Sequence, residues 1–281
     1  MIMRTRALAL IAMFALALAA CNGGDAGDGD GTPAPTGIDE SPGGDGAAGD
    51  LGLAQEGSIL VGSDIAFEPF EFVEDDENKG FDIDLMNEIA SRLGIEVEFV
   101  NTPFDTIFTQ LAGGEFDAII SAITITDERD ETIDFSDSYF AANQALAVAE
   151  GSDIGGVADI GGLQVGVQAG TTGLDYATEN FTDSEIVEFP TSEAAFSALE
   201  GGQIDAVFID LPVVGARVEQ GGVVLAEEVD TGELYGVGVE QGNDGLREAI
   251  NTQLEAIIAD GTYEEFYTTW FEGDVPEQFQ R

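Results

Sequence analysis

Apolar residues recur from Ser58 onward at spacings that alternate between those of a strand and those of a helix. A short apolar run at 59–62 and an alternating pattern at 95–100 each predict a strand. Between them, residues 82–93 place apolar side chains on one face of a helix, and Gly94 is a suitable residue to end it. This part of the chain therefore predicts a strand, a helix and a second strand.

The same order continues along the chain. Thr102 can cap a helix that has Pro103 at its first position and ends at Gly113, and residues 116–123 predict the next strand. Strands that alternate with helices favour a parallel sheet with right-handed crossover connections. The pattern predicts an α/β fold.

Two segments of the chain resemble each other. Residues 108–120 (FTQLAGGEFDAII) and 196–208 (FSALEGGQIDAVF) share a helix end, a Gly-Gly stop, an Asp-Ala pair and an apolar strand. Gly-Gly is a common helix stop, so a generic connection between a helix and a strand accounts for part of the match. The fixed offset of the other matching residues favours two similarly built lobes.

The first 56 residues differ in composition from the rest. Arg4 and Arg6 precede an apolar stretch that is too short to span a bilayer, as is typical of a secretory signal. The sequence LAAC at 18–21 resembles the bacterial lipobox, although an incidental thiol is the alternative for Cys21. We expect a lipoprotein signal peptide at 1–20, and a lipidated Cys21 that begins a flexible, acidic Gly/Asp/Pro linker at 21–56.

The chain has 56 acidic residues against 8 Lys and Arg, which gives a formal net charge of −48 at pH 7. The electrostatic field of so large a negative charge repels nucleic acid and anionic lipid headgroups. The acids are spread along the whole chain, which favours a solvated surface suited to high salt over an acidic binding face. We therefore expect a halophilic protein that binds no nucleic acid.

Histidine is absent and Cys21 is the only cysteine. These absences exclude an intrachain disulfide, a zinc site built from His and Cys, and a Ser-His or Cys-His catalytic pair. We expect no metal, no cofactor and no catalytic residue.

Residues 80–93 (GFDIDLMNEIASRL) match the signature of the family 3 extracellular solute-binding proteins, which bind polar amino acids. The resemblance covers essentially the whole chain after the linker, with the glutamine binders as its nearest likeness. The ordered set of blocks is more specific than the signature alone. The other family-like blocks are 63–72 (SDIAFEPFEF), 117–140 (DAIISAITITDERDETIDFSDSYF), 165–177 (VGVQAGTTGLDYA), 201–210 (GGQIDAVFID) and 235–271.

The resemblance implies the two-lobed α/β fold of the type II periplasmic binding proteins, with a ligand cleft between lobes joined by two hinge strands. Lobe 1 would comprise residues 57–140 and 238–281, and residues 141–237 would form lobe 2 with the hinge. The chain would cross near 139–143 and 233–237, and closure would be a hinge motion.

A free amino acid is a zwitterion, so its site needs a cation, N–H donors and an anion. Arg129 is the candidate cation, because its planar guanidinium suits a carboxylate and its context (TITDER) matches the carboxylate-binding Arg of the family. A salt bridge to a neighbouring acid is the alternative. Thr124 can offer its N–H and its hydroxyl. Thr171 and Thr172 begin a helix whose free N–H groups favour a carboxylate, although plain N-capping would also explain them.

The resemblance assigns the ligand ammonium to Asp210, at the carboxyl end of an apolar strand, with a helix cap as the alternative role. Ser121 and Ala122 would add backbone carbonyls. Phe67 and Phe104 match the positions that sandwich the ligand side chain in the family, although composition alone favours core positions for both.

Asp64 matches a family position near the far end of the ligand side chain. Gln168 and Ile209 stand where the glutamine binders have a basic residue and a His, which leaves glutamine specificity open. A carboxylate at Asp64 can accept hydrogen bonds from an amide or pair with a cation, and it repels a second carboxylate. We rank glutamine first, basic amino acids close behind and acidic ones last.

The predicted function is the substrate-binding component of an ABC importer: a monomer, lipid-anchored outside the cytoplasmic membrane or periplasmic, that delivers an amino acid to the permease subunits. The alternative is a cyclohexadienyl (prephenate or arogenate) dehydratase-like enzyme on the same fold, with Asp64 as the nearest candidate acid. A sensory ectodomain would need a transmembrane helix or a signalling module, and neither is recognised before Arg281.

Overall fold

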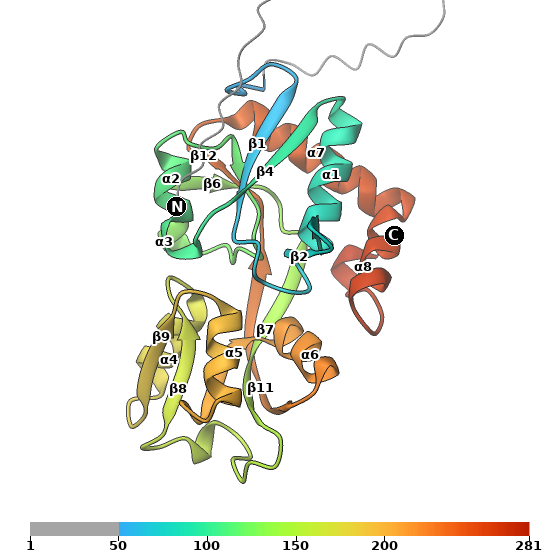
Figure 1. The fold of residues 1–281 in the computed structure, drawn as a ribbon. Coiled ribbons are helices and arrows are strands. Elements are labelled where there is room, and N and C mark those ends of the chain that lie inside the picture. Colours follow the sequence, from blue (N-terminus) through green and yellow to red (C-terminus); the bar gives the residue numbers. More distant parts are fainter. Residues whose placement is uncertain (1–50, 281) are drawn as a thin grey trace, which may run out of the picture. The chain divides into compact units, whose positions relative to one another are not determined.

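The computed structural model describes residues 51–280 of the chain. The predictions for the signal peptide, for Cys21 and for most of the linker fall outside this range. Within it, two five-stranded sheets and their covering helices form two lobes (Figure 1). None of the helices in the described part of the chain is long and apolar enough to cross a membrane.

The first lobe is built on a sheet with the strand order β4-β1-β5-β12-β6. β4 and β5 run parallel to β1, whereas β12 runs antiparallel to both β5 and β6. The sheet is therefore mixed, and not parallel throughout as predicted, because the chain leaves this lobe after β6 and re-enters it as β12. The strands are β1 (Ser58–Ser63), β4 (Glu96–Asn101), β5 (Ala118–Ile119), β6 (Ile133–Phe135) and β12 (Gly238–Glu240).

The helix predicted at 82–93 is confirmed as α1 (Phe81–Leu93). Ile83, Met86 and Ala90 are buried on one face, and Gly94 ends the helix in the left-handed region with φ 70°. The other helices of this lobe are α2 (Phe104–Ala112), α3 (Asp127–Asp130), α7 (Asp244–Asp260) and α8 (Thr262–Trp270), with the hairpin β2 (Phe72–Glu74) and β3 (Glu77–Lys79) before α1 and the 3-10 helix η2 (Glu277–Phe279) after α8.

Two local predictions are wrong in detail. Thr102 does not cap α2, because its hydroxyl donates to the carbonyl of Val100 at 3.2 Å and the extended backbone of Pro103 (ψ 135°) delays the helix to Phe104. The strand predicted at 116–123 is only two residues long, because the chain leaves the sheet after β5 and Ala122 adopts a φ of 46°. The segment that leaves the sheet lines a cavity between the lobes.

The second lobe has a sheet with the strand order β11-β7-β10-β8-β9. β8 runs parallel to β9 and β10, and β7 runs antiparallel to β10 and β11. The strands are β7 (Phe140–Ala149), β8 (Gln164–Gln168), β9 (Glu185–Phe189), β10 (Ala206–Asp210) and β11 (Val223–Tyr235), and the helices are η1 (Val157–Asp159), α4 (Thr172–Asn180), α5 (Ser192–Glu200) and α6 (Leu211–Gln220).

The two sheets repeat one strand order. Taken from β9, the order β9-β8-β10-β7-β11 corresponds position by position to β4-β1-β5-β12-β6. In each sheet the central strand follows a helix that ends at a Gly-Gly pair, since α2 leads to β5 and α5 leads to β10. The prediction of two similarly built lobes is confirmed.

Two strands connect the lobes. The chain passes from the first sheet to the second between Phe135 and Phe140, and it returns between Tyr235 and Gly238 (Figure 1). Phe140 pairs with Tyr235 across β7 and β11, and their rings stack with centroids 5.7 Å apart. Phe271, which follows α8, packs against Phe140 at 4.8 Å. Aromatic contacts therefore hold the crossing strands against the first lobe.

Candidate functional site

The carboxyl ends of strands from both lobes meet around one small cavity. The first lobe contributes the segments after β1 and β5 together with α2 and α3, and the second lobe contributes the ends of β8 and β10 and the start of α4. All the residues selected from the sequence as ligand-binding candidates line this cavity: Asp64, Phe67, Phe104, Ser121, Ala122, Thr124, Arg129, Gln168, Thr171, Thr172 and Asp210.

Arg129 supplies the cation of the cavity. Its Nη1 donates to the carbonyl of Thr124 at 2.8 Å and its Nη2 to the carbonyl of Gly170 at 3.1 Å, so the guanidinium contacts both lobes. It also lies over the rings of Phe108, at 4.5 Å, and Phe104, at 5.5 Å, which favours a cation. Burial lowers the pKa of Arg129 to about 10, so the side chain stays charged at neutral pH.

Arg129 differs from the other cations in the described part of the chain. Lys79, Arg92, Arg217 and Arg247 each pair with a carboxylate at 2.6 or 2.7 Å, whereas none of the described carboxylates lies within ion-pair distance of Arg129. The salt bridge considered as an alternative role is therefore not formed. In a chain with 56 acidic residues, a half-buried guanidinium without an anionic partner among the described residues is suited to bind an anion from outside.

Backbone N–H groups lie beside this cation at the start of α4. Thr171 caps the helix, since its Oγ1 accepts from the N–H of Leu174 at 3.1 Å and donates to the carbonyl of Gln168 at 2.8 Å. The N–H groups of Thr172 and Thr124 have no acceptor among the described residues. Capping thus uses a side chain and leaves the backbone donors for an anion, which the helix dipole also favours.

Asp210 supplies a buried anion at the end of β10. It accepts hydrogen bonds from the hydroxyl of Tyr235 and, at 3.3 Å, from Nε2 of Gln144. Its side chain makes no capping bond to α6, so the alternative role as a helix cap is not formed. Burial above all, and then the charge of Glu233, raise the pKa of Asp210 to about 7. An ammonium group beside it would favour the ionised form.

Ser121 and Ala122 form the cavity wall after β5. The N–H of Ala122, whose positive φ is unusual for a residue other than glycine, donates to Asp82 Oδ2 at 2.7 Å. The Ser121 hydroxyl accepts from the N–H of Asp64 at 3.1 Å and donates to Glu71 Oε1 at 2.7 Å. The carbonyl oxygens of Ser121 and Ala122 have no donor within the described chain, so both can accept from a ligand.

Asp64 and Gln168 meet across the cavity. Gln168 Nε2 donates to Asp64 Oδ2 at 2.7 Å, and Asp64 Oδ1 has no donor from the described residues. Burial is the main cause that raises the pKa of Asp64 to about 6; the bond from Gln168 lowers it and the charge of Asp105 raises it. Ile209, the other position that departs from the glutamine binders, packs in the core and does not line the cavity.

Glu233 does not line the small cavity, but it contacts two residues that do, and the sequence did not predict this contact. Its Oε2 accepts from the hydroxyls of Thr124 at 2.6 Å and Thr172 at 2.9 Å, and its Oε1 accepts from Gln144 Nε2 at 3.1 Å. The Thr124 hydroxyl, expected to face the ligand, is therefore engaged by Glu233. No local signal marks this residue, because β11 carries four acidic side chains and only the contact with Thr124 and Thr172 distinguishes one of them.

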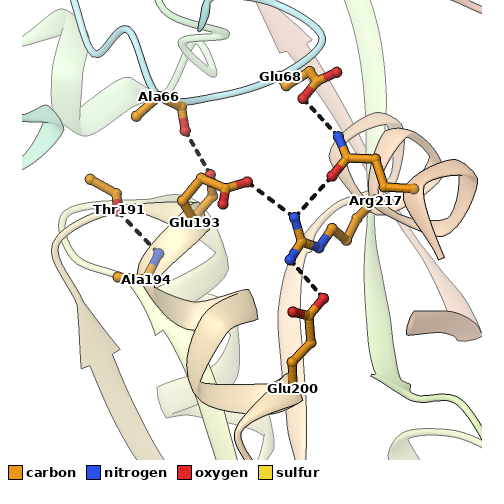
Figure 2. Close-up of polar contacts among 9 residues, drawn as sticks. Ala66, Glu68, Thr191, Glu193, Ala194, Glu200 and Arg217 are labelled. Atoms are coloured by element: carbon orange, nitrogen blue, oxygen red, sulfur yellow. Dashed lines mark hydrogen bonds and ion pairs between the residues drawn. The ribbon is translucent and has the colours of Figure 1, made fainter. Parts of the chain in front are cut away.

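The lobes also touch at the edge of the cleft (Figure 2). Ser192 Oγ donates to the carbonyl of Ala66 at 2.8 Å, and Gln220 Nε2 donates to Glu68 Oε2 at 2.8 Å. Arg217 orients the second contact, because its Nη1 donates to Gln220 Oε1 at 2.9 Å. Together with the contacts around the cavity, these hydrogen bonds hold the two lobes closed on each other.

A wider groove lies along the crossing strands between α6 and α8. Its charged lining residues are all acidic: Glu68, Glu219, Glu228, Glu233 and Glu272. It offers no cation to a carboxylate, in contrast to the small cavity. Among the described residues, no cluster of candidate ligands could hold a metal ion.

Comparison with known proteins gives the family. Residues 59–273 match the sequence profile of the bacterial extracellular solute-binding proteins, family 3. The histidine-binding periplasmic protein of Salmonella typhimurium is 35% identical over 230 residues, which cover 77% of this chain and 88% of that protein. The ABC transporter glutamine-binding protein GlnH of Bacillus subtilis is 36% identical over 206 residues, covering 72% of this chain and 76% of the relative.

The solved structures agree. An ancestral arginine-binding protein bound to glutamine superposes with a TM-score of 0.75 at 40% identity and covers 77% of this chain and 99% of that one. The strand order, the cavity between the lobes and the matched residues lead to one conclusion. The chain belongs to the bacterial extracellular solute-binding proteins of family 3.

Proposed function

We propose that this protein is the substrate-binding component of an ABC importer and that it captures a free polar amino acid in the cavity between its lobes. The observation that carries the proposal is the pair of opposite charges on the cavity wall: Arg129, which has no carboxylate partner within the described chain, and the buried Asp210. Both ends of a zwitterion would find a partner there. The names of the relatives, which specify histidine, glutamine and arginine, support an amino acid as the ligand.

The carboxylate and the ammonium group of the ligand would bind two different sets of cavity residues. The ligand carboxylate would bind the Arg129 guanidinium and the N–H groups of Thr124 and Thr172. The ligand ammonium would bind Asp210 and the carbonyls of Ser121 and Ala122. This arrangement recognises the part that all amino acids share, so it sets affinity and leaves specificity to the remaining residues.

The ligand side chain would lie along Phe67 and Phe104 and end near Asp64. The unpaired Oδ1 of Asp64 can accept from an amide N–H₂ or pair with a cation, and it disfavours a second carboxylate. We therefore keep glutamine first, basic amino acids close behind and acidic ones last.

Replacing either charge tests the proposal. Arg129→Ala and Asp210→Ala should each weaken binding by about 2–5 kcal/mol, because each leaves one buried ligand charge unpaired. The loss should be similar for every amino acid in a calorimetric titration. Arg247→Ala, which removes only a pair with Asp244 near the surface, is the matched control and should leave the Kd unchanged. Loss for a single ligand side chain would show that the two charges are misassigned.

Binding would be coupled to closure of the lobes. We assign residues 57–140 and 238–281 to one lobe and 141–237 to the other with the hinge, and the contacts of Asp64 with Gln168 and of Glu233 with Thr124 would form on closing. The radius of gyration from small-angle scattering should fall on saturation with ligand. An unchanged radius would contradict a hinge.

We further propose that Cys21 carries a lipid that holds the protein outside the cytoplasmic membrane, within reach of the permease. A diacylglyceryl group supplies two chains, which suffice for stable anchoring. Cys21→Ser should release the protein into the medium or the periplasm, and retention on the membrane after this change would refute the anchor.

One observation favours the enzymatic alternative. Asp64 lies in a small cavity with its pKa raised to about 6, as a general acid requires. Incubation with prephenate and with arogenate would yield an aromatic product from a dehydratase. We expect none, because Gln168 already occupies one oxygen of this carboxyl group.

A further inference from the structure

Two carboxyl groups lie fully buried behind the cavity wall. Glu71, in the segment before β2, and Asp82, at the second position of α1, each have 0% exposure and do not line the cavity. The two carboxyl groups interact electrostatically, and each influences the pKa of the other. No Lys or Arg of the described chain pairs with either of them.

Only half of their oxygen atoms have donors. Glu71 Oε1 accepts from the Ser121 hydroxyl at 2.7 Å, and Asp82 Oδ2 accepts from the N–H of Ala122 at 2.7 Å and from the hydroxyl of Tyr139 at 2.8 Å. Glu71 Oε2 and Asp82 Oδ1 are buried and have no donor among residues 51–280. Two adjacent carboxylates without a cation cannot both stay ionised in such a site, and one proton between them would satisfy both oxygen atoms.

We propose that Glu71 carries this proton and uses it to donate a hydrogen bond to Asp82. The resulting pair holds Ser121 and Ala122 in place from behind the cavity wall. Glu71 is the protonated member because Asp82 already accepts two hydrogen bonds, which favour a carboxylate, whereas Glu71 accepts one. Burial raises the pKa of Glu71 well above its usual range and that of Asp82 to about 7.

The pair acts through the backbone that it holds. Ala122 keeps a φ of 46° while its N–H is bound to Asp82, and Ser121 is held between the N–H of Asp64 and Glu71. Loss of the Asp82 acceptor would release this segment and turn its carbonyl oxygens away from the ligand ammonium. Glu71 and Asp82 are therefore positioning residues, and their effect on binding rests on the proposed function, whereas the shared proton does not.

Infrared spectroscopy tests the proton without any ligand. The other titratable groups around the pair are Asp64, Tyr139, Tyr235 and Tyr263; burial keeps the tyrosines neutral by raising their pKa values, and Asp64 has a pKa of about 6. Asp210, with a pKa of about 7, is also ionised at a pH of about 8.5. The wild-type protein should then show a carboxylic acid band that Glu71→Gln removes. The absence of such a band would overturn the proposal.

Ligand binding tests the positioning role. Glu71→Gln keeps an N–H donor toward Asp82 and an acceptor toward Ser121, so its Kd should stay within about threefold of wild type. Asp82→Ala removes the acceptor of the Ala122 N–H, and its Kd should rise by about tenfold or more. Tyr139→Phe is the matched control, because it removes a donor to Asp82 but leaves the Ala122 bond, and its Kd should change by less than about threefold.

The outcomes are separable. Equal losses in Glu71→Gln and Asp82→Ala, a larger loss in Glu71→Gln, or a lowered Tm with unchanged Kd in Asp82→Ala would overturn the positioning role. If Asp82→Ala does not fold, the infrared band together with the Kd of Glu71→Gln decides the proposal. If the wild-type protein binds no amino acid, the proposed function fails while the band still decides whether the pair shares a proton.

Discussion

At the residue scale, the cavity holds titratable groups that solvent screens poorly. Burial raises the pKa of Asp64 to about 6 and that of Asp210 to about 7, from ordinary values of 3.8. The folded protein therefore keeps protons that the unfolded chain releases at lower pH. The stability that these groups contribute is fully present below pH 3.8 and is lost as the pH rises through 6 and 7.

Ligand affinity should respond to pH in the opposite direction. A protonated Asp210 cannot pair with an ammonium group, so binding must displace its proton below its pKa of about 7. The Kd for glutamine should fall as the pH rises from about 5 to about 7 and should then level off. Calorimetry in buffers of different ionisation enthalpy measures both the Kd and the released proton. A Kd that is constant over this interval would contradict the pairing.

The candidate residues could be selected from the sequence because they stand in short segments that carry a motif. Arg129 lies in TITDER, and Thr171 and Thr172 lie in AGTTG. Each short segment therefore shows both the residue types that can bind a ligand and their spacing along the chain. Glu233 lies in none of the family-like blocks, and nothing in the blocks 63–72 and 80–93 indicates that Glu71 and Asp82 form a pair. Their roles depend on contacts between residues 40 to 109 positions apart, which only the folded chain brings together.

At the element scale, the start of α4 serves stability and binding at once. Its cap bond, from Leu174 N–H to Thr171 Oγ1, uses the side chain, while the free N–H groups of the first turn face the cavity. The elements themselves were largely predictable from apolar spacing, as α1 shows. The start of α2 and the end of β5 were not, because the backbone of Pro103 and the packing of Ala122 against Asp82 decide them.

A pair of cap variants separates the two roles of α4. Thr171→Ala and Asn243→Ala each remove a side-chain cap, of α4 and of α7, and should each lower the free energy of unfolding by about 1 kcal/mol. Only Thr171→Ala should also weaken ligand binding, because it loosens the N–H groups at the cavity. Denaturant titration and calorimetry check the two effects, and equal affinity in both variants would place the start of α4 outside the site.

At the scale of the whole molecule, charge dominates. The net charge is −48, and the described cations other than Arg129 are already paired, so most carboxylates repel one another without compensation. Salt should therefore stabilise the fold by screening this repulsion. We expect the Tm to rise between low and molar potassium chloride. A Tm that falls over this range would contradict adaptation to high salt.

The most direct test of the account asks whether the cavity binds both charged ends of a free amino acid. The purified protein, freed of bound ligand, would be titrated by calorimetry with glutamine and with arginine. Parallel titrations would use agmatine, which lacks the carboxylate of arginine, and the N-acetylated form of each amino acid, which lacks the ammonium. We expect at least one parent amino acid to bind and each of its analogues to bind at least about 30-fold more weakly, since one buried partner is left unpaired. Equal binding of a parent and its analogues, or no binding of any polar amino acid, would contradict the account.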